Sequence, residues 1–283
     1  LREKAAPGET PSVVIGYDGR KNSQIFAQDT AEIMSGAGLR AVLFPRLLPT
    51  PLVAFAVRQL AMSAGIMVTA SHNPPNDNGY KVYLGGADQG SQIVSPSDVE
   101  IEEHILRIAR ECRVPELSRS QAYEIAPESL IEAYISATAN VATPTRMQPR
   151  VVYTAMHGVG WQTLERVLAH AGFSKPTVVT AQIEPDAAFP TVAFPNPEEP
   201  GALALAYETA HAVNAELIIA NDPDADRLAV AIPDPSATEG YRRLTGNEVG
   251  ALLGWRAAEQ VTTGGSRQAP DATLACSLVS SPA

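Results

Sequence analysis

The feature that most constrains this chain is the stretch from Gly65 to Lys81, where a short apolar run breaks into turn-forming residues and then resumes. The run Ile66–Ala70 is apolar and partly β-branched, which predicts a strand. Two prolines, three asparagines and a glycine follow within nine residues, and each proline restricts its own backbone and that of the residue before it. We therefore expect a stiff loop that holds Ser71, followed by a second strand that returns Lys81 to its side.

Ser71, His72 and Lys81 together offer a nucleophilic hydroxyl, an imidazole and an ammonium group. Phosphoryl transfer through a serine needs such groups, because the attacking oxygen must lose a proton and the phosphate charge must be balanced. On residue types alone, an exposed turn without chemistry is the simpler interpretation. The sequence of Thr69–Pro74, followed by Asn78–Lys81, resembles the phosphoserine loop of the α-D-phosphohexomutase family, and this resemblance favours the catalytic interpretation.

The chain is long and acidic. Its 283 residues exceed the usual size of one domain, which predicts two domains, or two and part of a third. Its formal net charge of −10 argues against nucleic acid or an anionic membrane as a partner. A phosphate-binding site in such a chain must be a local basic cluster, for which the candidates are Arg20, Lys21, Lys81 and Arg227.

The two cysteines, Cys112 and Cys276, are far apart in the sequence and support neither a disulfide framework nor a thiolate zinc site. A reducing compartment fits this usage, so we expect a cytoplasmic protein. No uncharged apolar run reaches the roughly 18 residues of a membrane span, and Leu1–Thr10 is charged where a signal peptide would be apolar. The absence of an initiator Met indicates a trimmed start.

Strand and helix patterns alternate from the start of the chain. Val13–Asp18 reads as a buried strand, and Ser23 then caps a helix. The inward face expected for that helix consists of Phe26, Thr30, Ile33 and Met34. Another strand (Leu39–Phe44) and a helix after Pro49 follow, before the strand that leads to Ser71. Such alternation predicts a mostly parallel sheet covered on both faces, with ligands beyond the carboxyl ends of its strands.

Further helices complete this part of the chain. Ser97 and Glu100 have the spacing of a capping box, and the residues expected to face inward after them are Ile101, Ile105 and Ile108. A second helix near 128–138 leads to Thr143–Pro149, which has the composition of a domain linker. Resemblance and pattern together predict tandem three-layer α/β/α domains with mixed, mostly parallel sheets. Their expected bounds are 1–142, 149–263 and a third domain that begins at 271–283.

The alternation restarts with the strand Val151–Met156. The turn His157–Gly160 then opens a helix, and a glycine turn at a helix N-terminus can bind the phosphates of a dinucleotide. We reject that interpretation because the third glycine of the motif would fall on Thr163. His157 is expected to be a packed or hydrogen-bonded turn residue. Near the end, Thr245–Glu248 begins a helix whose expected inward residues are Val249, Leu252, Leu253 and Ala257.

Three carboxylates, those of Asp222, Asp224 and Asp226, crowd one loop between two apolar strands. Like charges this close repel, so they persist where a cation neutralises them, and oxygen ligands suit Mg²⁺ or Ca²⁺. An EF-hand fails, because its glycine would be Arg227 and its closing glutamate would be Pro233. A solvated acidic turn capped by Arg227 is the alternative without a metal.

The loop Asp222–Arg227 resembles the metal-binding loop of the same phosphohexomutases, although Pro223 and Ala225 stand where many members carry glycines. The resemblance implies a Mg²⁺-dependent mutase that interconverts the 1-phosphate and 6-phosphate of glucose or mannose through a bisphosphorylated sugar. Ser71 would carry the phosphoryl group and share the metal with the three aspartates. His72 and Lys81 would be acid-base and positioning groups, and Arg227 and Arg20 would steady the phosphate.

Other functions stay open at this point. A degenerate homologue could bind metal and sugar phosphate without turnover. A serine hydrolase is remote, because Ser71 has no Gly-x-Ser-x-Gly elbow. The proline form of the metal loop is similar to the branch with phosphopentomutases and bisphosphate synthases, so pentose phosphate remains a candidate substrate. The resemblance places the sugar-reading loop in a third domain, and we expect the 283-residue chain alone to be nearly inactive.

Overall fold

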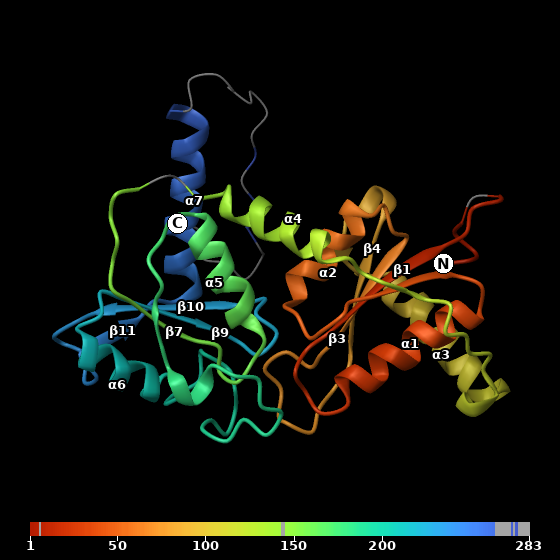
Figure 1. Cartoon of the computed structure of the whole chain (residues 1–283), viewed down its shortest axis with the longest axis horizontal. Coiled ribbons are helices and arrows are strands. Elements are labelled where there is room, and N and C mark those ends of the chain that lie inside the picture. Colours follow the sequence, from red (N-terminus) through yellow and green to blue (C-terminus); the bar gives the residue numbers. More distant parts are fainter. Residues whose placement is uncertain (6, 143–144, 264–272, 274, 277–283) are drawn as a thin grey trace.

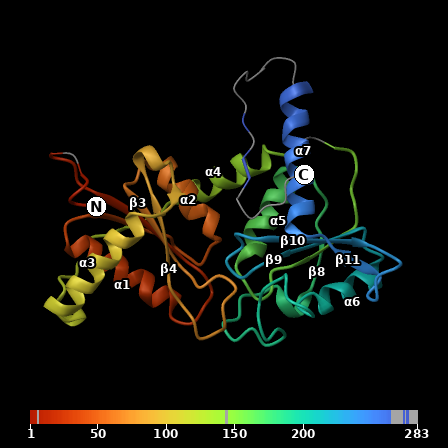
Figure 2. The same ribbon diagram turned by 180° about the vertical axis from the view of Figure 1, so that it is seen from behind.

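The computed structural model describes residues 1–283 except 6, 143–144, 264–272, 274 and 277–283. It contains two units, each with a β-sheet between helices (Figures 1 and 2). The mixed α/β architecture expected from the sequence is confirmed. Within the described residues, no helix is long and apolar enough to cross a membrane.

The first sheet has the strand order β5-β4-β3-β1-β2-β6. Its strands are β1 (Ser12–Tyr17), β2 (Arg40–Leu43), β3 (Ala64–Val68), β4 (Tyr80–Leu84), β5 (Ser91–Gln92) and β6 (Glu124–Ile125). The strands β3, β1, β2 and β6 run parallel, whereas β4 pairs antiparallel with both β3 and β5. The short loop after β3 can only return the chain in the opposite direction, because parallel neighbours need a long crossover. The returning strand predicted from the sequence is present as β4, and it pairs Lys81 with Met67.

Helices cover both faces of this sheet. The helices of this unit are α1 (Ser23–Gly36), α2 (Thr50–Gln59), α3 (Ser97–Glu111) and α4 (Glu128–Ala139), with 3-10 turns η1 (Gly86–Asp88) and η2 (Val114–Glu116). Of these, α1 covers one face, and α2 and α4 cover the other. Side chains alternate between the faces of a strand. Val13 and Ile15 therefore pack on one face with Ala31 of α1, whereas Val14 packs on the other with α2 and with Ile131 of α4.

The second sheet has the order β11-β10-β9-β7-β8. Its strands are β7 (Val151–Thr154), β8 (Thr177–Val178), β9 (Leu217–Asn221), β10 (Leu228–Pro233) and β11 (Tyr241–Arg243), and its helical segments are α5 (Gly160–His170), η3 (Thr180–Gln182), α6 (Ala204–Val213) and α7 (Gly246–Thr263). Tyr153 of β7 packs with α5 on one face, and Val152 packs with α6 on the other. The second unit thus repeats the layered pattern of the first.

Helices α4 and α5 join the two units. Val167 of α5 packs against the core of the first unit. Arg166 on the same helix is hydrogen-bonded to Glu128 and Glu132 of α4. Arg46 also pairs with Glu128, its Nη1 lying 2.7 Å from the carboxylate. The carboxyl ends of β3 and β9 also meet between the two units, where Ser71 is hydrogen-bonded to Asp222 of the acidic loop.

Several local expectations are wrong. On α1, the expected inward residue Phe26 is exposed, whereas Thr30 is buried and Met34 packs against the core as expected. The other buried residues of this helix are Ser23, Ala27 and Ala31. Ser97 is the first residue of α3, and the residue at the cap is Pro96, which makes no side-chain cap bond. Ile105 and Ile108 of that helix are exposed, because α3 lies at the edge of the unit and buries no residue.

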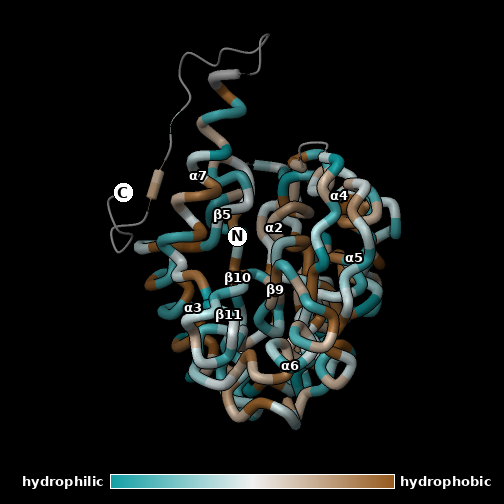
Figure 3. Tube along the Cα trace, turned by 90° about the vertical axis from the view of Figure 1, so that its left-hand side faces the viewer, coloured by the Kyte–Doolittle hydropathy of each residue, from teal (hydrophilic) through white to brown (hydrophobic). Residues whose placement is uncertain are grey.

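The helix α7 also differs from expectation. It stands away from the second sheet, with hydrophobic and hydrophilic residues alternating along it (Figures 1 and 3). Leu252 and Leu253, which we expected to face inward, are exposed because no other element described by the structure covers them. The expected third-domain start at 271–283 lies outside the described residues, apart from Thr273, Ala275 and Cys276.

Candidate active site

Ser71 lies just beyond the carboxyl end of β3 with a φ of 52°, in the left-handed region that residues with a Cβ rarely adopt. Such a conformation costs about 1–3 kcal/mol and persists only where the surroundings enforce it. Here the Ser71 amide donates to Oγ1 of Thr69 at 2.8 Å, and that hydroxyl donates to Oδ2 of Asp18 at 2.7 Å. The Thr69 amide is in turn hydrogen-bonded to Gly79 across the loop. The hydroxyl of Ser71 is therefore held in one place.

Arg20 shapes the same loop from behind. Its Nη2 donates to the carbonyls of Ser71 and Asn73 at 2.7 and 2.6 Å, and its Nη1 donates to those of Pro74 and Asp77 at 2.8 and 3.3 Å. Burial lowers the pKa of Arg20, and the Asp18 carboxylate opposes that shift. We expected Arg20 to steady the phosphate, but its side chain is 1% exposed and its terminal nitrogens bind the backbone. Its geometry is that of a loop organiser.

The acidic loop begins where β9 ends, at the same interface. Ser71 Oγ donates to Oδ2 of Asp222 at 2.8 Å, although 151 residues separate them. Asp222 Oδ1 accepts from the backbone amide of Arg227 at 3.0 Å. Asp222, Asp224 and Asp226 each offer a carboxylate oxygen within 4.8 Å of the others. The structure thus brings the hydroxyl and all three carboxylates into one site.

The concentrated negative charge of this cluster favours a bound cation. Burial, followed by the charges of Asp224 and Asp226, raises the pKa of Asp222 to about 7. For Asp224, burial would raise the pKa, but the ammonium of Lys81 and the hydrogen bonds from Thr50 and Asp222 together outweigh it, and the net shift is downward. Oδ1 of Asp224 is buried and has no hydrogen-bond partner among the described residues. An unpaired buried carboxylate oxygen beside two further carboxylates fits the oxygen-only ligand set of Mg²⁺.

Lys81 reaches the cluster from β4. Its Nζ donates to Oδ2 of Asp224 at 2.7 Å and to Oδ2 of Asp226 at 2.5 Å. Burial favours a lower pKa for Lys81, but the two carboxylates prevail and raise it. The ammonium therefore stays protonated and balances part of the negative charge.

His72 and Arg227 complete the set predicted from the sequence. Nδ1 of His72 lies 3.4 Å from Ser71 Oγ. Burial and the positive charge of Arg227 lower the pKa of His72, which favours the neutral imidazole. The side chain of Arg227 is 53% exposed and lies 3.9 Å from Asp226. This exposure leaves its guanidinium accessible to a ligand from solvent.

The turn His157–Gly160 supports the acidic loop, a role that sequence reasoning missed. A Cβ on Gly158 would lie 2.3 Å from Cα of Pro223, so only glycine fits there. The Val159 amide donates to the Pro223 carbonyl at 2.8 Å. His157 is buried and its Nε2 is 2.8 Å from Oγ1 of Thr191, which confirms the expected hydrogen-bonded turn residue.

Ala225 has a backbone conformation that favours glycine. Its φ is 54°, again in the left-handed region.

Thr50 is hydrogen-bonded to Asp224, a contact that the sequence did not indicate because the two residues are 174 positions apart.

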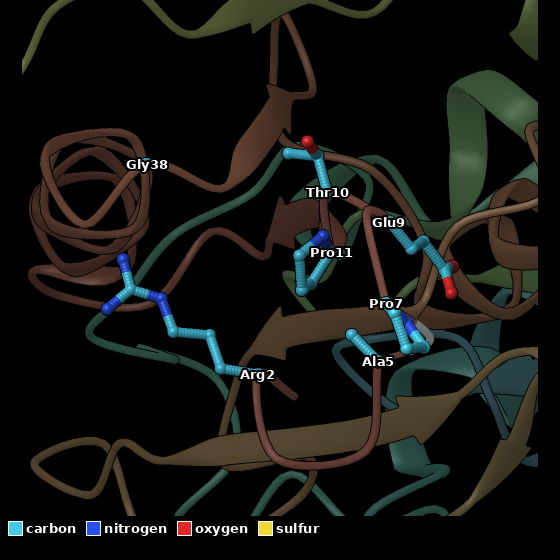
Figure 4. A pocket seen from close by; sticks show the side chains of 7 residues that line it. All are labelled: Arg2, Ala5, Pro7, Glu9, Thr10, Pro11 and Gly38. Atoms are coloured by element: carbon cyan, nitrogen blue, oxygen red, sulfur yellow. The ribbon is translucent and has the colours of Figure 1, made fainter.

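A pocket of about 370 Å³ lies elsewhere, on the N-terminal segment (Figure 4). It is lined by Arg2, Ala5, Pro7, Glu9, Thr10, Pro11 and Gly38. Pro11 immediately precedes β1, and Gly38 lies two residues before β2. The pocket is therefore at the amino ends of the parallel strands, opposite the edge that carries Ser71.

Comparison with known families agrees with this geometry. Residues 1–111 match the model of phosphoglucomutase/phosphomannomutase α/β/α domain I, and residues 132–235 match that of domain II. The chain belongs to the phosphoglucomutase/phosphomannomutase family. The family expected from the loops at Ser71 and Asp222 is thereby confirmed, and each loop falls within one of the two matched domains.

Relatives of this mutase-family chain carry more than one name. A Haemophilus influenzae protein named "Probable phosphomannomutase" is 56% identical over 96% of this chain and 54% of its own length. Phosphopentomutase from Mus musculus is 38% identical over 86% of this chain and 41% of its own length. The chain thus spans about half the length of these relatives. A solved structure of a phosphomannomutase homologue from Thermus thermophilus has a TM-score of 0.71 and 29% identity, covering 88% of this chain and 54% of its own.

Proposed function

We propose that this family member provides the phosphoserine and metal sites of a hexose-phosphate mutase, with mannose or glucose as the sugar. The observation that carries the proposal is the 2.8 Å hydrogen bond from Ser71 Oγ to Asp222. It joins a strained serine of one domain to a carboxylate cluster of the other, which is the arrangement a metal-bound phosphoserine requires. The family match and the 56% identity to a relative named as a phosphomannomutase support the reaction class.

In the proposed reaction, the phosphoserine donates its phosphoryl group to the free hydroxyl of the sugar phosphate. The bond from phosphorus to Ser71 Oγ breaks as the bond to the sugar oxygen forms, which gives a bisphosphorylated sugar. The sugar hydroxyl gives up its proton to a base, and the released Ser71 oxygen takes up a proton. After the sugar reorients, Ser71 Oγ attacks its other phosphate, and the bond from that phosphorus to the sugar oxygen breaks as the sugar oxygen takes up a proton. The serine proton passes to a base, and the neutral imidazole of His72, 3.4 Å from Oγ, suits that role.

Lys81 and Arg227 are proposed to balance the negative charge of the phosphate. Lys81 is held protonated by Asp224 and Asp226, which suits it to balance charge and to donate a hydrogen bond to the phosphate. Arg227 has an exposed side chain next to Asp226, where it can pair with a phosphate oxygen. Arg20 keeps the loop carbonyls turned away from the reacting oxygen. Positioning of this kind supplies most of the acceleration in phosphoryl transfer.

Mg²⁺ is the cofactor that the site fits. Asp222, Asp226 and the unpaired Oδ1 of Asp224 would hold it, together with an oxygen of the phosphoserine. When bound, it would disperse the negative charge that the transferring phosphoryl group carries.

A phosphopentomutase is the second candidate, because a relative of that name is 38% identical to this chain. We also propose a cytoplasmic location, which the two free cysteines support. Cell fractionation followed by immunoblotting tests that location, and recovery with the periplasmic or secreted fraction would contradict it.

The reaction is tested with the full-length protein, Mg²⁺ and a bisphosphate primer, against mannose 1-phosphate, glucose 1-phosphate and ribose 1-phosphate. We expect turnover of a hexose phosphate, and its loss in Ser71→Ala. A preference for ribose 1-phosphate would favour the second candidate. Activity of Ser71→Ala equal to wild type would contradict the phosphoserine mechanism.

A further inference from the structure

Thr50 is the first residue of α2, in the first domain, and it is 2% exposed. It makes two hydrogen bonds to one residue of the other domain. Its hydroxyl donates to Oδ2 of Asp224 at 2.5 Å, and its backbone amide donates to the Asp224 carbonyl at 2.9 Å. The amide at the start of a helix has no partner within the helix, so this contact satisfies it.

These bonds determine which oxygen of Asp224 stays free. Oδ2 accepts from both Thr50 Oγ1 and Lys81 Nζ, so its lone pairs are occupied. Oδ1 is buried and lacks a partner within the described part of the chain. Two donors on one oxygen fix the rotation of the carboxylate, which leaves Oδ1 as the oxygen that can bind a cation. The backbone bond fixes the position of the Asp224 main chain as well.

Pro49 and Pro51 flank Thr50 and make it a rigid donor. Pro49 occupies the cap position with an extended backbone, and Pro51 lies in the first turn of α2, where its fixed φ suits a helix. The bulk of α2 is anchored in the first core through Leu52 and Val53, which are almost fully buried. The hydroxyl of Thr50 therefore cannot follow Asp224 if the acidic loop moves.

We propose that Thr50 is a positioning residue for the metal site, which orients Asp224 across the domain interface so that its Oδ1 faces the cation. This inference rests on the proposed Mg²⁺ site. Its consequence is that metal affinity depends on a residue of the domain that carries no aspartate ligand. Partners that orient a ligand in this way typically change metal affinity by about 10–100-fold when removed.

The test is calorimetric titration of Mg²⁺ into the full-length protein, with Ser71 in one phosphorylation state verified by intact mass. Thr50→Val removes the hydroxyl and keeps the shape, and we expect Mg²⁺ affinity about 10–100-fold weaker. Thr50→Ser keeps the hydroxyl, and we expect affinity close to wild type. The matched control is Thr209→Val on α6, where the lost hydroxyl binds only the Leu205 carbonyl of its own helix. Its Mg²⁺ affinity should not change.

Equal affinity of wild type and Thr50→Val would overturn the inference while leaving the metal site intact. Absence of Mg²⁺ binding by wild type would instead overturn the metal site, and the inference with it. Circular dichroism and the urea midpoint identify a variant that does not fold. In that event Thr50→Ala replaces Thr50→Val, with the same expected loss of affinity.

Discussion

The guanidinium carbon of Arg20 lies 5.0 Å from the centre of the Phe189 ring, in a contact that crosses the domain interface. Phe189 is buried and belongs to the proline-rich loop of residues 184–200. A Cβ on Gly19, beside Arg20, would lie 3.0 Å from Cβ of Pro185 in the same loop. A desolvated cation–π contact contributes about 2 kcal/mol. The second domain thus covers the residue that shapes the Ser71 loop.

We predict that Arg20→Lys loosens the Ser71 loop without unfolding the protein. Lysine cannot donate to four carbonyls from one planar group, so the loop loses bonds that only arginine makes. Hydrogen–deuterium exchange should speed up by about tenfold or more at the amides of 71–79, equivalent to about 1.4 kcal/mol. The control is Lys21→Ala at the exposed neighbouring position. Unchanged exchange in Arg20→Lys would show that the loop keeps its conformation without the hydrogen bonds of Arg20.

Ser71 is predicted to carry a phosphoryl group in part of the purified protein. The loop directs its hydroxyl at the acidic cluster, and the family resemblance implies a phosphoserine there. Peptide mass spectra should place one phosphoryl group within residues 69–81, and Ser71→Ala should lose it. Phosphate found only on other segments, in repeated fresh preparations, would contradict this assignment.

Asp224→Asn should weaken Mg²⁺ binding while the fold persists. The amide is nearly the same size as the carboxylate but is neutral and a poorer ligand, and we expect about 10–100-fold lower affinity by calorimetry. Asp234→Asn is a suitable control, because Asp234 is an aspartate of the same domain that pairs with Ser236 and lies outside the cluster. If Asp224→Asn binds Mg²⁺ as wild type does, these carboxylates are not the metal site.

Gly158→Ala should lower the stability of the second domain. The added methyl group meets the backbone of Pro223 at 2.3 Å, and the backbone cannot yield as a flexible side chain does. Overpacking typically costs about 1–3 kcal/mol, which a lower urea midpoint would report. At Gly250 of α7 an added Cβ has no neighbour within 4 Å, so Gly250→Ala should be neutral or slightly stabilising. Equal midpoints for Gly158→Ala and wild type would mean that the acidic loop shifts freely.

Much of the fold was predictable from local pattern. The strands before Ser71 and Asp222 are marked by apolar runs that end in turn residues, and the returning strand places Lys81 as expected. The capping-box spacing occurs at the start of two helices, with different outcomes. Ser97 and Glu100 have this spacing but do not form the box, whereas Thr245 and Glu248 exchange both hydrogen bonds at the start of α7. Spacing alone does not decide whether a serine caps a helix or lies inside it.

The contacts between distant segments could not be predicted. Nothing in the sequence near Thr50 indicates a partner in the other domain. The sequence also does not distinguish Arg20 from other loop arginines, because the carbonyls that it binds belong to a distant segment. Leu252 and Ile105 were expected to face inward, but both are exposed. Helical periodicity identifies an apolar face, but what covers that face depends on tertiary structure.

The hydrogen bond from Ser71 to Asp222 belongs to the unmodified serine alone. A phosphoserine ester oxygen has no hydrogen to donate, so phosphorylation removes one of the bonds that tie the first domain to the second. It also sets a phosphate of nearly two negative charges beside a buried carboxylate. The same pair of residues therefore attracts in one covalent state and repels in the other, and after phosphorylation a cation between the two groups would restore the contact across the domain interface.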